Sequence, residues 1–148
     1  MVNVSINPFG AVPVFDGESP RIVTGKAAAT LSGGNFVVFS GAAAGTVGSS
    51  LSQFSAADLV VNQMVNPHQV NGLLLQNVAS GGYCSVARGG TYIGRAGTAI
   101  SGGNALVATA TGDCVNAVGI GSTGSIAPIG RALSNAGSEA FVLFDLLL

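Results

Sequence analysis

Short runs of apolar residues alternate with clusters of glycine, serine and asparagine along most of this chain. One phrase recurs: an apolar residue leads into Ser-Gly-Gly, and a run rich in β-branched or aromatic residues follows. It occurs three times, within 30–39, 79–87 and 98–107. Glycine reaches positive φ without a Cβ penalty, and serine or asparagine can hydrogen-bond the backbone of a turn. Each phrase therefore predicts a tight turn that leads into a β-strand.

Further strand-like runs lie between and after these phrases. With the phrases included, the expected strands lie at 22–24, 36–39, 73–75, 83–87, 91–93, 106–111, 114–118 and 141–147. Many short strands at regular spacing are typical of a small sandwich or barrel. The 23 glycines suit the corners that such a fold needs. We therefore expect an all-β, single-domain fold, a β-barrel or β-sandwich, spanning 21–148.

One segment, at about 55–65, carries the pattern of a helix. Ser55 can cap its N-terminus, and Asp58 stands at the third helical position, which completes a capping box. Asn66 and Pro67 would then end the helix. The sequence thus predicts one short helix in an otherwise β-rich domain.

Residues 1–20 form a distinct segment, which we expect to be an extended N-terminal arm. Three prolines exclude a helix here and bias the residues before them toward extended geometry. Its apolar anchors are Val12, Val14 and Phe15. Such an arm could pack on its own domain or lie on a neighbouring subunit, and the sequence leaves both open.

Charge is scarce, at 7% of residues, whereas about 25% is typical of soluble domains. The surface must therefore be solvated by small polar residues or covered by partners. The net charge of −1 and the scattered positions of the five basic residues argue against nucleic-acid binding. No apolar run approaches the length of about 18 residues that predicts a membrane helix, so no membrane partner is expected.

The residues able to carry chemistry form no recognisable site. His68 is the only histidine, and it lacks the partners of a catalytic relay or a zinc site. The string Gly-Ile-Gly-Ser-Thr-Gly at 119–124 matches a dinucleotide fingerprint in letters, but no helix follows it. Cys84 and Cys114 indicate buried free thiols, although a disulfide between them remains open. We expect no catalytic residues, metal, cofactor or small-molecule substrate.

The segments 72–111 and 128–146 resemble the small capsid decoration, or cement, proteins of tailed phages. The shared pattern is an apolar run, a small-residue turn, a strand, a glycine pair with an aromatic residue, Pro-Ile-Gly-Arg-Ala, and a final alternating strand. In this sequence these features are Leu73-Leu74-Leu75, Ala79-Ser80-Gly81-Gly82, Cys84-Ser85-Val86, Gly89-Gly90-Thr91-Tyr92, Pro128-Ile129-Gly130-Arg131-Ala132 and Phe141-Val142-Leu143.

The resemblance implies a non-enzymatic virion protein, assembled in the host cytoplasm. It would bind the outer capsid surface as a homotrimer and stabilise the capsid by bridging major capsid protein subunits. The strand at 141–148 would complete either the core or a subunit interface. The candidate interface residues are Val12, Val14, Phe15, Phe141, Phe144 and Leu146.

Two alternatives stay open. One is another structural part of the virion, such as a head fibre, spike or tail subunit. The other is a β-sandwich carbohydrate-binding or adhesion module. The latter needs exposed aromatic side chains, and the chain has no tryptophan and only Tyr83 and Tyr92 as tyrosines.

Overall fold

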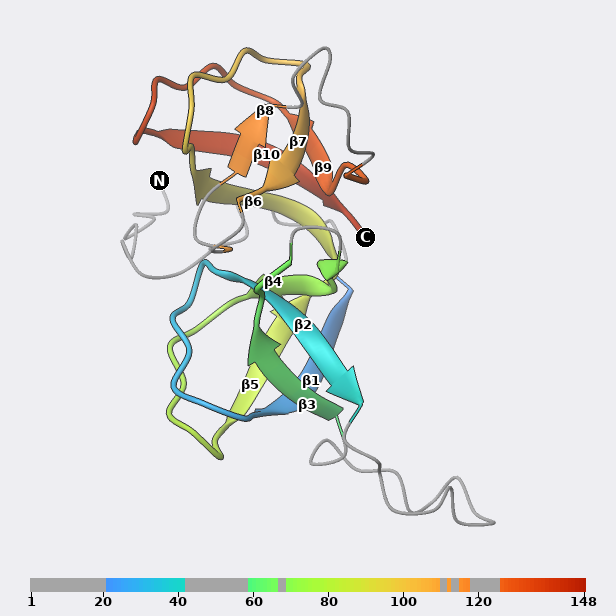
Figure 1. The fold of residues 1–148 in the computed structure, drawn as a ribbon. Coiled ribbons are helices and arrows are strands. Elements are labelled where there is room, and N and C mark those ends of the chain that lie inside the picture. Colours follow the sequence, from blue (N-terminus) through green and yellow to red (C-terminus); the bar gives the residue numbers. More distant parts are fainter. Residues whose placement is uncertain (1–20, 42–58, 67–68, 110–111, 113–114, 118–125) are drawn as a thin grey trace, which may run out of the picture.

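The computed structural model describes residues 21–41, 59–66, 69–109, 112, 115–117 and 126–148. Within them the chain forms ten β-strands, arranged in two five-stranded sheets that lie one above the other in Figure 1. The expected all-β fold is confirmed.

The first sheet closes into a barrel. Its strands are β1 (Ile22–Ala27), β2 (Phe36–Gly41), β3 (Leu59–Gln63), β4 (Gly72–Leu74) and β5 (Tyr83–Ala87). Their order around the barrel is β1-β3-β2-β4-β5. Strand β1 closes the ring, because it pairs in parallel with β3 and antiparallel with β5.

The second sheet has five strands in the order β6-β10-β9-β7-β8. They are β6 (Gly89–Arg95), β7 (Ala105–Ala108), β8 (Val115–Ala117), β9 (Gly130–Ala132) and β10 (Phe141–Leu147). Its two edge strands approach each other at one isolated parallel bridge, between Ala96 and Val115. The sheet is therefore a partly open barrel.

The two sheets are the same unit built twice. Strands β1 to β5 correspond in order to β6 to β10, and every pairing of the first unit recurs in the second. The parallel contact of Ala27 with Val61 has its counterpart in Ala96 and Val115. The strands follow one another around the ring in the same order in both units. The units differ in how far the ring is closed.

The turns recur with the same hydrogen bonds. In the first unit the Gly33 N–H donates to Asn77 Oδ1 at 2.8 Å, and in the second the Gly102 N–H donates to Asn135 Oδ1 at 2.7 Å. Each asparagine thus ties a Ser-Gly-Gly turn to a distant loop. The duplication therefore extends to the side chains that fix the loops.

A second turn differs between the units in one residue. Gly81 has φ +80°, and the corresponding residue of the second unit is Glu139, with φ +64°. Their equivalence follows from the backbone, because the Gly81 N–H donates to Ala27 O and the Glu139 N–H donates to Ala96 O, both at 2.8 Å. Left-handed backbone favours glycine, so the turn at Glu139 is strained.

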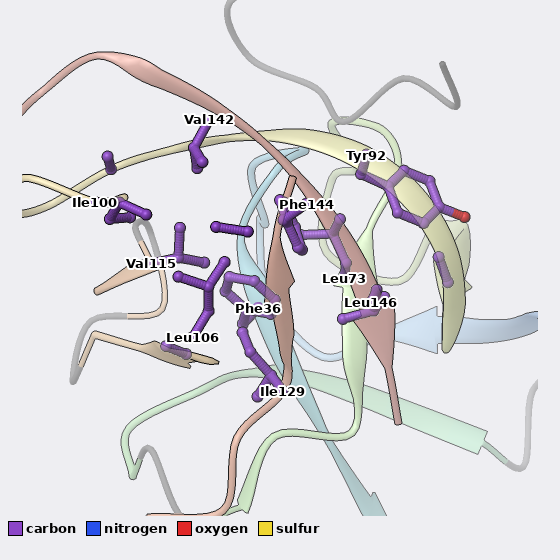
Figure 2. Close-up of a cluster of buried hydrophobic side chains, with 14 of the residues drawn as sticks. Phe36, Leu73, Tyr92, Ile100, Leu106, Val115, Ile129, Val142, Phe144 and Leu146 are labelled. Atoms are coloured by element: carbon purple, nitrogen blue, oxygen red, sulfur yellow. The ribbon is translucent and has the colours of Figure 1, made fainter. Parts of the chain in front are cut away.

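The two units share a hydrophobic core. The larger cluster combines the interior of the second unit with four buried residues of the first, which are Phe36, Met64, Leu73 and Ala87. The Phe36 and Phe144 rings lie 6.4 Å apart at 51°, and Figure 2 shows Phe36 near Phe144 and Leu106. The Phe36 N–H also donates to Gly112 O at 2.6 Å. The smaller cluster fills the first barrel alone.

The helix expected at about 55–65 is wrong for its described part, because Leu59–Gln63 is strand β3. Residues 55–58 lie outside the described residues. Strand β3 pairs with β1 on one side and β2 on the other, and Val61 is fully buried between them. Pairing on both edges and the β-branched side chains of Val60 and Val61 outweigh the local capping signal.

Truncation of Phe36 tests the shared core. We expect Phe36→Ala to lower the free energy of unfolding by about 3–5 kcal/mol, since it leaves a cavity between the units. Denaturant unfolding followed by circular dichroism measures the change. Phe141→Ala, at a half-exposed position, is the matched control and should cost less than about 1 kcal/mol. Equal losses in the two variants would contradict this account of the core.

The duplicated turn offers a reciprocal test of backbone strain. Glu139→Gly should raise the free energy of unfolding by up to about 1 kcal/mol, because glycine tolerates positive φ. Gly81→Ala should lower it by about 1 kcal/mol, although an added Cβ there would meet no atom within 4 Å. Both values come from denaturant unfolding. Changes of the same sign in the two variants would exclude backbone strain as the cause.

Candidate interaction surface

Strand β10 alternates between a buried and an outward face. Val142, Phe144 and Leu146 are fully buried, whereas Phe141 is 53% exposed. Two of the predicted interface residues, Phe144 and Leu146, therefore lie in the core of the chain itself rather than on its surface, because side chains along a strand alternate with a period of two. The strand was expected to complete either the core or a subunit interface. One of its faces completes the core.

The other predicted interface residues lie in two places. Phe141 is on the surface, at the start of β10. Val12, Val14 and Phe15 fall within the expected arm and lie outside the described residues.

The outward face of β10 carries a row of apolar side chains that extends to β6 on one side and to the residue after β9 on the other. Leu143 pairs with Ile93 of β6, and on its other side its carbonyl accepts a 2.8 Å hydrogen bond from the Leu133 N–H. Leu133 is 46% exposed, while Leu143 and Ile93 are partly exposed. Phe141 lies two residues before Leu143 on the same face. Together these four residues form an outward apolar surface on the second unit.

Few charges border this surface. Phe141 pairs across the strands with Arg95, whose guanidinium forms an ion pair with Glu139. In the opposite direction along β10, Asp145 Oδ1 accepts a 2.5 Å hydrogen bond from the Thr91 hydroxyl. Arg95 is offset by Glu139, and Asp145 pairs across the strands with the exposed Arg131, so opposite charges meet at both ends of this face and apolar area dominates between them.

The corresponding face of the first unit has its residues in the same arrangement, but its side chains are more polar. Tyr83 is 57% exposed and pairs across the strands with Lys26, as Phe141 does with Arg95. The next row contains Thr24, Ser85 and Leu75, in the places of Ile93, Leu143 and Leu133. The sequence analysis missed this matched pair of faces. Alignment of the two halves of the chain would have found it.

The residues considered for chemistry form no site in the described structure. Among the described residues no group of three His, Cys, Asp or Glu side chains could hold a metal ion. None of the described segments is a helix long and apolar enough to cross a membrane. His68, Cys114 and the string at 119–124 lie outside the described residues.

Cys84 is a free, buried cysteine in β5, as the sequence predicted for it. Its Sγ lies 3.6 Å from Gly25 O and can donate a weak hydrogen bond to it. Burial raises the pKa of the Cys84 thiol above its usual value, because desolvation disfavours the thiolate. The side chain therefore acts as a small apolar core residue.

Comparison with solved structures found a similar fold. The fold is similar to that of a phage head fibre base. The solved structure is the N base of head fiber gp8.5 of bacteriophage phi29, with a TM-score of 0.50 and 15% sequence identity. The match covers 86% of this chain and 93% of that chain. Scans against protein-family models and curated proteins found no match.

This likeness concerns the fold. Because it covers most of both chains, it includes both units of the duplication rather than a single barrel. At 15% identity, it transfers no residue role.

The buried thiol gives a further prediction. In a Cys114→Ser variant, Cys84 should react with a thiol reagent at pH 8 only after denaturant is added, because the raised pKa and burial suppress thiolate formation. Absorbance of the released thiol product measures the reaction. Full labelling of the native protein within minutes would show that Cys84 is accessible.

Proposed function

We propose that this chain is a non-enzymatic structural part of a phage virion that attaches to the outer surface of the head. The observation that carries the proposal is the fold likeness to a head fibre base, which extends over 93% of that chain. The resemblance of 72–111 and 128–146 to capsid decoration proteins points to the same location by a separate route, the sequence. Both lines lead to the phage head.

The surface supports this role. An outward row of Leu133, Leu143 and Ile93 beside Phe141 is apolar area of the kind that partners cover. The charged fraction of 7% likewise suits a part that works inside an assembly rather than alone in solution.

Two placements on the head are compatible with this proposal. The comparison favours a head fibre base, in which the domain anchors a projecting structure. The second candidate is the cement role, in which the domain bridges neighbouring major capsid protein subunits. The duplicated faces favour this second candidate, since they could contact two subunits at once. The cement placement includes major capsid protein as the partner and a homotrimeric state.

A carbohydrate-binding module fits the structure less well. Such a module needs aromatic side chains exposed as a platform. Of the two tyrosines, Tyr92 is fully buried, and its hydroxyl lies 3.2 Å from Gly89 O, to which it donates. Among the described residues, the exposed aromatic side chains are Tyr83 in the first unit and Phe141 in the second, so neither unit presents a platform of several aromatics.

Co-sedimentation with empty, expanded capsids from the same source tests the proposal. We expect saturable binding at a fixed ratio to the major capsid protein, because attachment points repeat on the lattice. Capsids from an unrelated phage are the control and should bind nothing. If the purified protein stays in the supernatant with its own capsids at every concentration, the proposal is wrong.

Heating of loaded and bare capsids separates the two placements. A cement protein should raise the temperature at which the capsid opens, since it adds contacts between subunits. A fibre base should bind without changing that temperature. Light scattering during the temperature ramp records the difference.

A further inference from the structure

The duplication provides an internal comparison of equivalent surface positions. Some residues match between the units because the fold needs them. Asn77 and Asn135 fix the same turn, and the Ser80 and Ser138 hydroxyls donate to equivalent backbone oxygens at 3.1 Å each. Outward side chains that match between the two units are not explained by a role in holding the fold together.

An aromatic residue beside a basic one is the clearest outward match. Tyr83 pairs with Lys26 in the first unit, and Phe141 pairs with Arg95 in the second. Both aromatic side chains are more than half exposed, so neither contributes greatly to the core. A large exposed aromatic is unfavourable in water unless a partner covers it.

A leucine completes the match. Leu75 donates its N–H to Ser85 O at 3.0 Å, and Leu133 does the same to Leu143 O at 2.8 Å. Ser85 lies two residues after Tyr83, as Leu143 does after Phe141, so each leucine borders its aromatic residue on the outward face. Leu75 is partly buried and packs against the shared core, whereas Leu133 is 46% exposed. The outward match is therefore closest for the aromatic residue and the basic residue.

The basic residue at this position is notable because the chain has only five Lys and Arg residues. Two of them, Lys26 and Arg95, occupy equivalent positions. The other three, Arg21, Arg88 and Arg131, correspond by strand register to Gly90, Leu146 and Leu73. This surface position is therefore the one where positive charge occurs in both units.

We propose that the two surfaces dock onto two copies of one partner protein, at an apolar site bordered by carboxylates. The first surface is Tyr83 and Lys26, beside the partly buried Leu75, and the second is Phe141, Leu133 and Arg95. The inference rests on the proposed function, because a capsid lattice offers the same site on neighbouring subunits. The aromatic residue fills the apolar site, and the cation binds the carboxylates. Arg95 can do so beside Glu139, because a guanidinium has five N–H donors.

The two contacts differ in strength and in salt dependence. The second surface is extended by Leu143 and Ile93, so it buries more apolar area. Arg95 already pairs with Glu139, whereas the residue that corresponds to Glu139 in the first unit is Gly81, which has no side chain. The contact of Lys26 is therefore the more sensitive to ionic strength.

Bivalent attachment predicts a distinctive loss on mutation. When two linked contacts act together, the second adds about 10²–10⁴-fold to the affinity of the first. Tyr83→Ser and Phe141→Ser should each weaken capsid binding by about 10²–10⁴-fold, with the larger loss for Phe141→Ser. The double variant should show no saturable binding in the same range. Co-sedimentation with expanded capsids measures all three.

Val65→Ser is the matched control. Val65 is 81% exposed and lies outside both surfaces, so this variant should bind as the wild type does. Thermal unfolding of each variant tests whether the fold is retained. Lys26→Glu provides a variant that leaves the apolar area intact, and it should weaken binding most at low salt.

The outcomes separate the inference from the function on which it rests. If the wild type fails to bind capsids, both are wrong. If the wild type binds and either single variant equals it, attachment is not bivalent and the inference alone is overturned. If the double variant changes oligomeric state in sedimentation velocity, the surfaces join copies of this chain, which also overturns the inference.

Discussion

The packing of Phe36 of the first unit against Phe144 of the second is the contact on which the rest of the structure depends. The strands of the first barrel are only three to six residues long, and a ring of five such strands encloses little apolar volume. The first barrel alone has a core of eight buried residues, which is small for independent stability. Sharing a core joins the two units and holds their outward faces in a fixed relation.

The sequence predicted the β-rich fold because its turns and strands are local features. Ser32-Gly33-Gly34 and Ser101-Gly102-Gly103 do turn the chain before β2 and β7. The duplication was hidden because the third phrase, at 80–82, is a different turn, whose counterpart in the second unit contains Glu139. Three similar phrases suggested one motif repeated, whereas the fold contains two different turns, each used twice.

The errors of the sequence reading arose where long-range contacts decide the structure. Strand β3 carries helix-capping signals upstream, but it lies between two partners that are distant in sequence. Phe141, Phe144 and Leu146 of β10 are all apolar, so the sequence alone did not distinguish exposed from buried positions. Only Phe141 is exposed. Strand alternation predicts that difference as soon as one residue is known to face the core.

The difference between the two outward faces bears on how such a domain would stay attached. One face combines Tyr83 and Lys26 with a polar row, and the other combines Phe141 with Leu143 and Ile93. Apolar contacts weaken little with salt, whereas the attraction between opposite charges is strongest at low ionic strength. Two linked contacts of different physical origin do not fail under the same conditions. A duplicated unit whose faces have diverged in this way would hold its position on a surface over a wider range of ionic strength than two identical faces.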